Sequence, residues 1–577
     1  MPLTLIDGRP EGWSVRRIGV IGPGIVGMPM AAMLANARIC EGSDTPARVT
    51  VIQRASPTSG WKVDSINAGK SPIGGVEPDL DRVVAESVAA GLLDASHDIS
   101  TLSDADVVLV CVQTDKKGFG PDYGPLFDAL EGLAAALAKR PAGNIPLVVF
   151  ESTLAPSSMA TLVRDLFARH GLVDGRDILL GNSPNRVMPG RLVERVRDSD
   201  KIVAGLNPAT PELIHRLYGR IVTQGILLPT NSLTGEMVKT LENAYRDVRI
   251  AYAAEVVRWC DDHEVDFFAL RDAVNVRLAQ TDGASANPTA VPTGGLLVPT
   301  VGVGGHCLPK DGILLWWRRL EAGHDGRNSL ILRARKINDA SPMATLHLAE
   351  RAFGDIEGRK FVLLGTAYRF DSEDTRNSPT LTLARLLLGR GAHVTLTDPY
   401  VRLGDQNLMR TDLNAHFQPD LAKAMRGAEV AIACTGHRVY ADDVAGILAA
   451  GAPTLKGFVD GCNLTGRQAV ESHGVGYTGI GRGRKVPGQG LVDEVVAGFQ
   501  AVERGVAREV ADLADFYNAR YAETDFQRIV FADVQRIAGT CTTGCAIVDP
   551  LPPDPLPGFE DVRSTLVDCA FGDGPNP

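Results

Sequence analysis

Residues 16–34 read RRIGVIGPGIVGMPMAAML, and this stretch decides the fold. The apolar run at 16–22 ends in glycine, and the apolar residues from Met28 to Leu34 have the spacing of a helix. A strand that turns through glycines into a helix lets its backbone approach a pyrophosphate. The sequence therefore predicts a dinucleotide site at the turn, formed by Gly22, Gly24, Ile25, Val26 and Gly27. A turn that binds nothing is the alternative.

The end of the next predicted strand, Val49–Ile52, is where such a site contacts the ribose. An acidic residue is usual there, about twenty residues after the turn. Gln53 and Arg54 stand at this position instead. Gln53 suits hydrogen bonding to the ribose, whereas Arg54 suits a 2′-phosphate. NAD is the predicted cofactor, and NADP is the less favoured alternative.

Further strand-like runs occur at 107–112 and 147–150, and 123–137 has helical spacing between them. A second series begins at 359–365, passes through the helix-like LTLARLLLGRG, and continues at 393–397, 429–434 and 457–460. Alternating strands and helices indicate parallel sheets covered by helices on both faces. The sequence predicts two doubly wound α/β domains.

A long helix is predicted between them. Residues 232–263 have helical apolar spacing and contain no Gly or Pro after Gly235, and Thr234 is the expected cap. Lys239 and Asn243 lie four apart and share a face, with Glu236 three residues before the lysine. A solvated polar stripe is the alternative interpretation for this helix taken alone.

The segment 281–305 is rich in Gly, Pro and Thr, which predicts a loop, and it leads into GVGGHCLPKD at 302–311. Cys307 lies among glycines that permit close approach of a ligand, and basic neighbours favour a thiolate. An inert small apolar cysteine is the alternative. Beyond Lys485 the chain has a tail, helical at 491–521 and proline-rich at LPPDPLPG, to which the pattern assigns no role.

The bulk composition excludes several function classes. With 577 residues the chain is long enough for three or four domains. A net charge of −10 argues against nucleic-acid binding, and no run is apolar enough to span a membrane or direct secretion. We expect a cytoplasmic protein with reduced cysteines. Cys541 and Cys545 lack a second ligand pair, so no metal is expected.

The chain resembles the UDP-glucose/UDP-N-acetylmannosamine dehydrogenases, the nucleotide-sugar 6-dehydrogenases, over residues 16–485. The resemblance rests on ordered motifs: GPGIVG, CVQT at 111–114, EST at 151–153, SPNRVMPG from Ser183, GEMVKTLENAYRDVRIA, GVGGHCLPKD, YRFDSEDTRNSP from Tyr368, HVTLTDPY and GYTGIGRG. It implies an enzyme of polysaccharide biosynthesis that oxidises C6 of a UDP-hexose to a carboxylate with NAD.

The resemblance also implies a domain division and a homodimer. The expected parts are a NAD-binding Rossmann domain at 1–228, a central helical dimerisation domain with the cysteine loop at 229–345, a UDP-sugar-binding domain at 346–485, and a C-terminal helical extension at 486–577. The two Rossmann-like domains are joined by the long central helix, through which the homodimer would form.

Site residues follow from the matched motifs. Cys307 is the expected nucleophile, Lys239 and Asn243 hold the C6 oxygen, and Asp311 orients water. The expected NAD contacts beyond the glycine turn, Gln53 and Arg54 are Thr114, Thr153, Lys310 and Arg376. Gly304 and Arg369 are expected to contact the sugar nucleotide.

Two positions depart from the family pattern. Asn185 stands where the family has a glutamate associated with proton transfer, and an amide is not a base, so Thr153 with a water or Asp311 would take that role. Arg369 replaces the usual lysine. His306 and the glycines before it favour a UDP-N-acetylhexosamine, UDP-N-acetylmannosamine first, whereas the PKD that follows favours UDP-glucose.

Two rival functions remain at this point. A two-domain hydroxyacid or phosphosugar dehydrogenase shares the glycine turn and the long helix, but it performs one oxidation and needs no nucleophilic cysteine. A nucleotide-sugar-binding relative whose chemistry has lapsed would explain Asn185 and the missing acid at position 53. The presence of Cys307, Lys239, Asn243 and Asp311 argues against the second.

Overall fold

The computed structural model describes residues 5–6, 9–10, 12–74, 77–140, 145–187, 190–278, 295–541, 544–550 and 564–571. The chain forms two compact units: unit 1 contains 1–242, 314–324 and 510–547, and unit 2 contains 243–313, 325–509 and 548–577. The predicted proline-rich run and most of the predicted 281–305 loop lie outside the described residues. The four-part division by function stays a prediction.

Unit 1 is built on an eight-stranded sheet in the order β12-β11-β10-β9-β6-β3-β4-β5. Its strands are β3 (Arg17–Ile21), β4 (Arg48–Ile52), β5 (Leu93–Ser96), β6 (Val107–Val110), β9 (Leu147–Phe150), β10 (Leu179–Asn182), β11 (Lys201–Gly205) and β12 (Leu227–Asn231). Two short antiparallel pairs lie outside it, β1 (Leu5–Ile6) with β2 (Arg9–Pro10) and β7 (Asp115–Lys117) with β8 (Gly120–Asp122).

This sheet is mixed, which corrects the expectation of a wholly parallel one. The strands from β10 to β5 run parallel, whereas β11 pairs with β10 antiparallel and β12 follows β11. The chain between β10 and β11 contains the seven-residue α6 (Leu192–Asp198), and it returns to the sheet antiparallel to β10, the last of the parallel strands.

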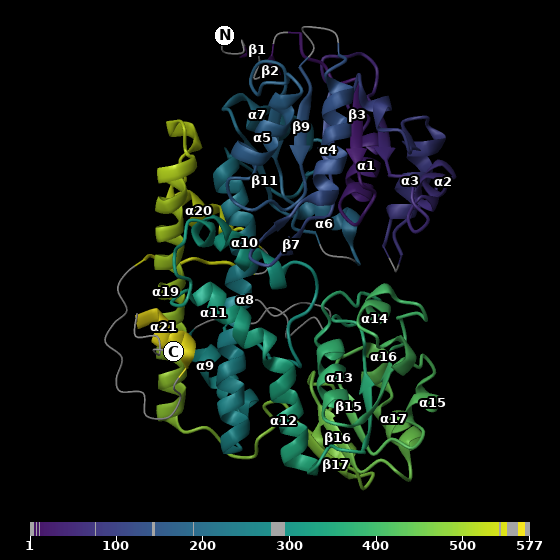
Figure 1. Cartoon of the computed structure of the whole chain (residues 1–577), viewed down its shortest axis with the longest axis vertical. Coiled ribbons are helices and arrows are strands. Elements are labelled where there is room, and N and C mark those ends of the chain that lie inside the picture. Colours follow the sequence, from purple (N-terminus) through teal and green to yellow (C-terminus); the bar gives the residue numbers. More distant parts are fainter. Residues whose placement is uncertain are drawn as a thin grey trace. The chain divides into compact units, whose positions relative to one another are not determined.

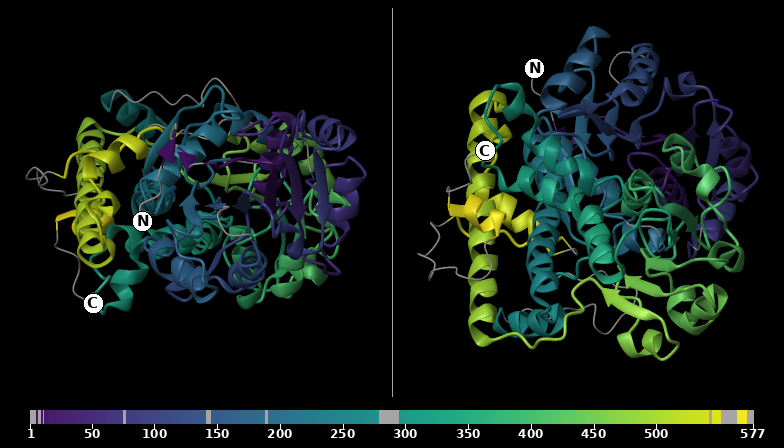
Figure 2. Two further views of the ribbon diagram at one scale, coloured as in Figure 1. Left: turned by 90° about the horizontal axis from the view of Figure 1, so that it is seen from above. Right: turned by 60° about the horizontal axis from the view of Figure 1, so that its bottom comes forward.

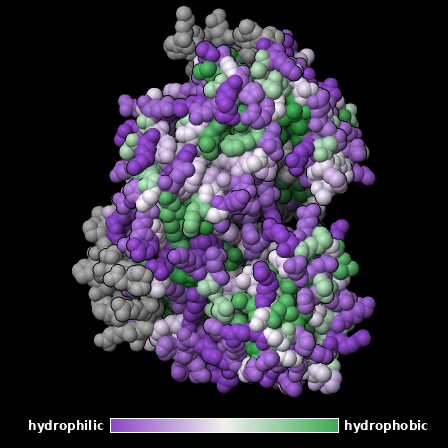
Figure 3. Space-filling model, viewed as in Figure 1, coloured by the Kyte–Doolittle hydropathy of each residue, from purple (hydrophilic) through white to green (hydrophobic). Residues whose placement is uncertain are grey.

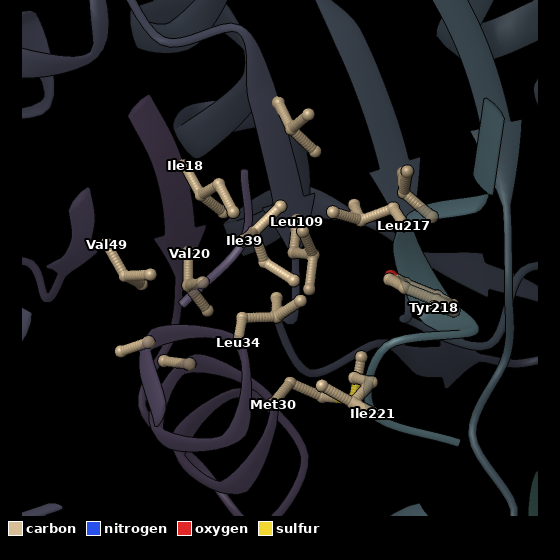
Figure 4. Packing of buried hydrophobic residues seen from close by; sticks show 14 of the residues in the cluster. Ile18, Val20, Met30, Leu34, Ile39, Val49, Leu109, Leu217, Tyr218 and Ile221 are labelled. Atoms are coloured by element: carbon tan, nitrogen blue, oxygen red, sulfur yellow. The ribbon is translucent and has the colours of Figure 1, made fainter. Parts of the chain in front are cut away.

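Helices cover both faces of the unit 1 sheet (Figure 1). They are α1 (Gly27–Asn36), α2 (Trp61–Asn67), α3 (Leu80–Ala89), α4 (Gly124–Leu137), α5 (Arg164–Arg169), α6 and α7 (Ala209–Tyr218). Unit 1 also contains α20 (Phe531–Ala538). On β6, Val107 and Leu109 enter one buried cluster, with α1, α3 and α7, and Val108 and Val110 enter another, with α4 and α5. Figure 4 shows part of the first cluster, with Ile18 and Val20 of β3, Met30 and Leu34 of α1, and Leu217 and Tyr218 of α7.

Unit 2 contains a five-stranded parallel sheet in the order β14-β13-β15-β16-β17. Its strands are β13 (Lys360–Leu364), β14 (His393–Thr397), β15 (Val430–Ala433), β16 (Gly457–Asp460) and β17 (Gly476–Gly479). The helices α12 (Ser341–Phe353) and α13 (Pro379–Gly389) cover one face. The other face carries α15 (Leu421–Met425), α17 (Val444–Gly451) and α18 (Arg467–Glu471), and the unit also holds α14 (Gln406–Arg410) and α16 (Arg438–Asp442).

The remaining helices are α8 (Ser232–His263), α9 (Phe267–Arg277), α10 (Leu308–Glu321), α11 (Leu330–Asp339), α19 (Gln489–Tyr521) and α21 (Thr565–Phe571). Three of them, α8, α10 and α19, continue from one unit into the other. The predicted long helix is confirmed, but its cap is not Thr234. The Thr234 N–H donates to Asn231 Oδ1 at 2.8 Å, because the helix begins directly where β12 ends.

The two doubly wound sheets and the long helix confirm the predicted fold class. None of the helices in the described ranges is long and apolar enough to cross a membrane. On the face that Figure 3 displays, hydrophilic residues cover most of the surface of each unit and hydrophobic residues form small groups.

Candidate functional site

The glycine turn of unit 1 has the geometry of a phosphate cradle. Gly22 has φ +94°, and a Cβ there would meet the Cys111 carbonyl oxygen at 2.8 Å. A Cβ on Gly27 would meet the Gly22 oxygen at 2.1 Å, so this glycine lets α1 pack against the strand end. A Cβ on Gly24 would meet no atom within 4 Å. Gly24 therefore faces open space at the start of α1, where no side chain caps the helix, and these residues fit a pyrophosphate.

The residues after β4 lie beside this turn in the expected order. The half-buried Gln53 donates from Nε2 to Ser59 Oγ at 3.0 Å and to the Arg54 carbonyl at 3.1 Å, while Arg54 is exposed. Sequence reasoning missed Lys62 on α2, whose Nζ donates to the Pro23 carbonyl at 3.4 Å. Partial burial lowers the pKa of Lys62. A cation at the glycine turn fits a phosphate-bearing ligand.

Thr114 and Thr153 follow the neighbouring strands β6 and β9, and the structure brings them together. The buried Thr114 hydroxyl donates to the Thr153 carbonyl oxygen at 2.8 Å. Because β3, β6 and β9 are adjacent and parallel, both threonines lie at the same edge of the sheet as the glycine turn. This edge is where doubly wound sheets bind their ligands.

Asn185 joins a buried network centred on Glu151, which follows β9. The Asn185 Nδ2 donates to Glu151 Oε2 at 2.6 Å, and Lys201 Nζ donates to the same oxygen at 2.7 Å. The Tyr218 hydroxyl donates to the other carboxylate oxygen, Oε1. Glu151 is 3% exposed and Lys201 is 5% exposed. A buried carboxylate therefore accepts directly from the Asn185 amide.

Burial and the charges of this network shift the pKa values of three neighbouring groups. Burial lowers the pKa of Lys201, and the charge of the nearby Lys239 lowers it further. Glu151 acts in the opposite direction and raises this pKa. Burial and the charge of Glu151 raise the pKa of Tyr218 well above its ordinary value. The same two causes raise the pKa of Cys111, so that its thiol stays protonated. Cys111 is therefore not a candidate nucleophile.

The first half of α8 carries Lys239, which is 8% exposed, into this part of unit 1. Glu236, one turn before it, accepts the backbone N–H groups of Ser157 and Met159, both at 2.8 Å. Burial raises the pKa of Glu236 to about 8, although these two hydrogen bonds and Arg318 lower it. Glu236 thus fixes the loop that carries Thr153 against the helix that carries Lys239.

In unit 2, Cys307 is exposed and directly precedes α10. Its carbonyl oxygen accepts the N–H groups of Lys310 at 3.1 Å and Asp311 at 3.0 Å, so the residue forms the amino end of the helix. The partial positive charge of a helix amino terminus favours an anionic group there. All nine cysteines lie in described residues, and each is a thiol rather than half of a disulfide.

The glycines of the Cys307 loop make room for neighbouring residues of the chain. A Cβ on Gly304 would meet Tyr368 Cβ at 2.5 Å, and one on Gly305 would meet the Tyr368 ring at 2.9 Å. The Gly305 N–H donates to the Arg376 carbonyl, and Asn377 Nδ2 donates to the Gly305 carbonyl. The loop is thus attached to the segment that follows β13.

Asn243, Lys310 and Asp311 form a connected triad. Lys310 Nζ donates to Asp311 Oδ1 at 2.5 Å, and Asn243 Nδ2 donates to Asp311 Oδ2 at 2.6 Å. Asp311 is 0% exposed and Lys310 is 2% exposed, whereas Asn243 is half-buried. The carboxylate therefore orients the Asn243 amide with both of its oxygens engaged, and the Lys310 ammonium is directed to Asp311.

The loop after β13 carries the two arginines. Arg376 donates to the Asp374 carboxylate, and both Tyr368 and Cys307 lie near enough to raise its pKa further. The Arg369 guanidinium lies 5.5 Å from the ring centre of Phe370. His437 anchors this loop: the Asp371 N–H donates to its Nδ1 at 2.9 Å, so Nε2 carries the proton that faces Asp398 at 3.1 Å.

The predicted residues gather in two groups. Unit 1 brings together the glycine turn, Thr114 and Thr153, with Asn185 and Lys239 near the Glu151 network, and unit 2 brings together Cys307, the triad and the loop with Arg376. Sequence reasoning missed Lys62, Lys201, Tyr218 and the ion pair of Arg186 with Glu242. Glu151, Arg186 and Glu242 lie in matched motifs, whereas Lys62, Lys201 and Tyr218 lie outside all of them. In the described residues no group of three acidic, histidine or cysteine side chains is placed to hold a metal.

Comparisons with known proteins match most of the chain. Three sequence profiles of the UDP-glucose/GDP-mannose dehydrogenase family match in order: the NAD binding domain at 16–222, the central domain at 233–340 and the UDP binding domain at 362–467. The chain is 30% identical to the UDP-N-acetyl-D-mannosamine dehydrogenase of Pyrococcus horikoshii over 472 residues, which are 81% of this chain and 99% of the relative.

The chain is also similar to solved structures of nucleotide-sugar dehydrogenases. The NDP-N-acetyl-D-galactosaminuronic acid dehydrogenase of Methanosarcina mazei is 30% identical, with a TM-score of 0.68 over 82% of this chain and 96% of its own. The structure of a UDP-D-ManNAc dehydrogenase from Pyrococcus horikoshii is 30% identical, with a TM-score of 0.66 over 81% of this chain and 99% of its own.

Proposed function

Because the chain belongs to the UDP-glucose/GDP-mannose dehydrogenase family, we propose that it oxidises the C6 hydroxyl of a UDP-N-acetylhexosamine to a carboxylate, with Cys307 as the covalent nucleophile. The chain is an NAD-dependent oxidoreductase that acts on a nucleotide sugar. The observation that carries the proposal is the exposed Cys307 at the amino end of α10, next to the Asn243–Asp311–Lys310 triad.

NAD binds at the turn of Gly22, Gly24 and Gly27 in this proposal. When bound, NAD would supply the acceptor for one hydride, so two NAD molecules in turn would take the two hydrides that an alcohol loses on the way to an acid. Gly24 leaves open space for the pyrophosphate, and Thr114 and Thr153 lie at the same sheet edge. Gln53 contacts the ribose, while Lys310 and Arg376 remain proposed contacts. Both of these cations have a carboxylate partner within the chain, Asp311 and Asp374.

Cys307 keeps the aldehyde from escaping between the two oxidations. Its sulfur adds to the aldehyde carbon and forms a thiohemiacetal, which loses the second hydride and becomes a thioester. Water then adds to the thioester carbon, the C–S bond breaks with the Cys307 thiolate as leaving group, and the sugar carboxylate is released. The amino terminus of α10 stabilises the thiolate that begins and ends this cycle.

Lys239 and Asn243 hold the reacting C6 oxygen. They lie four apart on α8, so their side chains leave the helix on one face. The Asn243 amide has two N–H groups, and one of them donates to Asp311; the second is the proposed donor to the oxygen. One such donor is typically worth ~3 kcal/mol of transition-state stabilisation. Asp311 is then a positioning residue that acts through Asn243.

In this proposal, the hydrolysis of the thioester proceeds without a glutamate at position 185. Asn185 cannot accept a proton, and its Nδ2 is held by Glu151. We propose that Asn185 orients substrate or water through its amide, and that a water on Thr153 takes the role of the missing glutamate. The slow step is then the release of the acid.

The substrate class follows from the relatives and the loops. The relatives and solved structures named above act on N-acetylated nucleotide sugars by their names. We propose UDP-N-acetylmannosamine as the first candidate substrate, with UDP-glucose as the alternative. Arg369 and the backbone of Gly304 contact the nucleotide sugar. A cytoplasmic location and a homodimer through the central helix are the remaining parts of the proposal.

A panel of UDP-sugars offered with NAD and with NADP, followed by absorbance of the reduced cofactor, tests the proposal. We expect the fastest reduction of NAD with a UDP-N-acetylhexosamine and two reduced cofactors for each sugar. One reduced cofactor per sugar would indicate a single oxidation and no covalent step. Tight binding of a UDP-sugar without any reduction would indicate a relative whose chemistry has lapsed.

A further inference from the structure

The carboxyl-terminal segment of the chain lies beyond the last family profile, which ends at residue 467. The segment is mostly helical, with α19, α20 and α21, and Figures 1 and 2 show α19 alongside α8. Residues 510–547, which include α20, belong to unit 1. None of the three profiles includes α20, so the family match assigns this helix no role.

A buried arginine lies next to Asn185 in the sequence and joins its loop to α8. The side chains of Arg186 and Glu242 form an ion pair, and both are buried. Arg186 Nη1 also donates to the Asp200 carbonyl oxygen at 3.2 Å. A guanidinium has five N–H groups, and buried N–H groups need acceptors. The Glu242 carboxylate and one carbonyl therefore supply only part of what Arg186 requires.

The end of α20 supplies two further acceptors. Arg186 Nη2 donates to the Ile537 carbonyl oxygen at 3.0 Å, and Nη1 donates to Thr540 Oγ1 at 2.9 Å. The Thr540 hydroxyl gives its own proton to the Ile537 carbonyl at 2.8 Å, so its oxygen is left to accept from Arg186. The negative end of a helix dipole also favours a cation there. The last turn of α20 thus holds the Arg186 guanidinium.

The chain that leads into α20 is itself fixed to unit 1. Asn518, near the end of α19, donates to the Ile529 carbonyl at 2.9 Å and accepts the Ile529 N–H at 2.7 Å. Asn231, at the end of β12, donates to the Arg528 carbonyl at 2.9 Å. The apolar face of α20 is buried. The helix therefore presents its last turn to Arg186 from a fixed position.

The position of Arg186 bears on two residues of the proposed site. Asn185, the preceding residue, donates to Glu151 at 2.6 Å, and Glu242 lies three residues after Lys239 on α8. The ion pair of Arg186 with Glu242 therefore joins the Asn185 loop to the turn of α8 that carries Lys239. A displacement of ~1 Å in a group that positions a substrate can lower the rate ~100-fold.

We propose that Thr540, with the last turn of α20, positions Arg186 and thereby holds the Asn185 loop against α8. Thr540 is a positioning residue that acts through Arg186 rather than through contact with the sugar or the cofactor. The inference rests on the proposed function, because the loop that Thr540 orders is the loop proposed to orient substrate or water. It gives the carboxyl-terminal segment a task in the proposed reaction.

Kinetics of Thr540→Val test the proposal, because valine keeps the branched shape of the side chain and removes its oxygen. We expect kcat/KM for the UDP-sugar to fall at least ~10-fold. The KM for NAD should stay at the parent value, since the glycine turn lies outside this hydrogen-bond network. Thr540→Ser keeps the oxygen and should retain the parent values. The control Glu523→Gln breaks an ion pair with Arg164 whose carboxylate is exposed, and it should leave these constants unchanged.

Two kinetic results would overturn the proposal. The first is a Thr540→Val enzyme with the kcat/KM of the parent. The second is a loss in Thr540→Val that Thr540→Ser shows to the same extent, or that is accompanied by an equal rise of the KM for NAD. Such a loss would indicate general damage to the fold rather than a displaced loop.

Hydrogen exchange tests the positioning without an assay of activity. Backbone amides in 183–187 should exchange at least ~10-fold faster in Thr540→Val than in the parent or in Thr540→Ser, because a buried charged group has lost an acceptor. Unchanged exchange in Thr540→Val would overturn the proposal. A parent enzyme that reduces no NAD with any UDP-sugar would refute the proposed function instead, and the exchange rates would still decide whether Thr540 orders the loop.

Discussion

Replacing the buried carboxylate of the triad gives the sharpest prediction. Asp311→Asn leaves the Lys310 ammonium, 2% exposed, without the carboxylate that now lies 2.5 Å away. Breaking a buried ion pair by removing one partner costs ~3–5 kcal/mol. Lys310→Met should cost a similar amount, because it leaves Asp311, 0% exposed, with Asn243 as its remaining side-chain partner among the bonds described above.

The double variant Lys310→Met/Asp311→Leu separates stability from catalysis. It removes both charges together, and replacing a buried pair by apolar residues is often neutral for stability. Most of the loss should therefore be recovered in urea unfolding followed by circular dichroism. The Asn243 amide still lacks its acceptor, so kcat for NADH formation should stay at least ~10-fold below the parent, as for a lost oriented donor.

The control is Asp325→Asn, which breaks an exposed ion pair with Arg327 and should leave the urea midpoint unchanged. Single triad variants that cost less than ~1 kcal/mol, or a double variant as active as the parent, would refute the reasoning. The first result would show that the pair is hydrated, and the second that Asn243 needs no fixed orientation.

Three further predictions concern unit 1. Gly24→Val places a side chain in open space, so it should raise the KM for NAD at least ~10-fold and leave the urea midpoint unchanged. The added Cβ of Gly27→Ala meets the Gly22 oxygen at 2.1 Å, so this variant should lower the free energy of unfolding by ~1–3 kcal/mol. Equal effects of the two variants on KM and on stability would contradict the roles assigned to these glycines. Asn185→Glu sets a second carboxylate against Glu151, so urea unfolding should show a free energy of unfolding lower by ~1–3 kcal/mol, which adding Glu151→Gln should restore. If Asn185→Glu alone reacted faster than the parent, the result would argue against the Glu151 network. The pKa of Glu236 is about 8 in the folded protein and 4.5 ordinarily. Its contribution to the free energy of unfolding is therefore complete below pH 4.5 and is lost as the pH rises to about 8. Urea midpoints over this range should therefore fall more steeply in the parent than in Glu236→Gln, and identical slopes would refute the burial argument.

The sequence predicts the elements whose pattern is local. The glycine turn, β9, β14, β16 and the long helix follow from apolar runs and turn residues, and their positions are confirmed. The strands β5, β10, β11, β12 and β17 were missed. Several of them interrupt the apolar run, as β5 does with Asp94 and β12 with Pro229 and Thr230, so they lack the pattern of a buried strand.

The site is less predictable because its partners are distant in the sequence. Asn243 and Asp311 are 68 residues apart, and Glu151 and Lys201 are 50 apart. No local pattern shows that Lys201 enters beside β10, because this depends on the antiparallel turn of β11. The same holds for the loop glycines near Cys307, because the residue beside them, Tyr368, comes from a distant segment, the loop after β13.

The covalent role of Cys307 is tested most directly by the products of Cys307→Ser. The parent should convert a UDP-N-acetylhexosamine to its acid with two NADH per sugar. The serine variant should bind the UDP-sugar as the parent does, unfold at the same urea concentration and form no acid. Acid made by the serine variant at the rate of the parent would contradict the account.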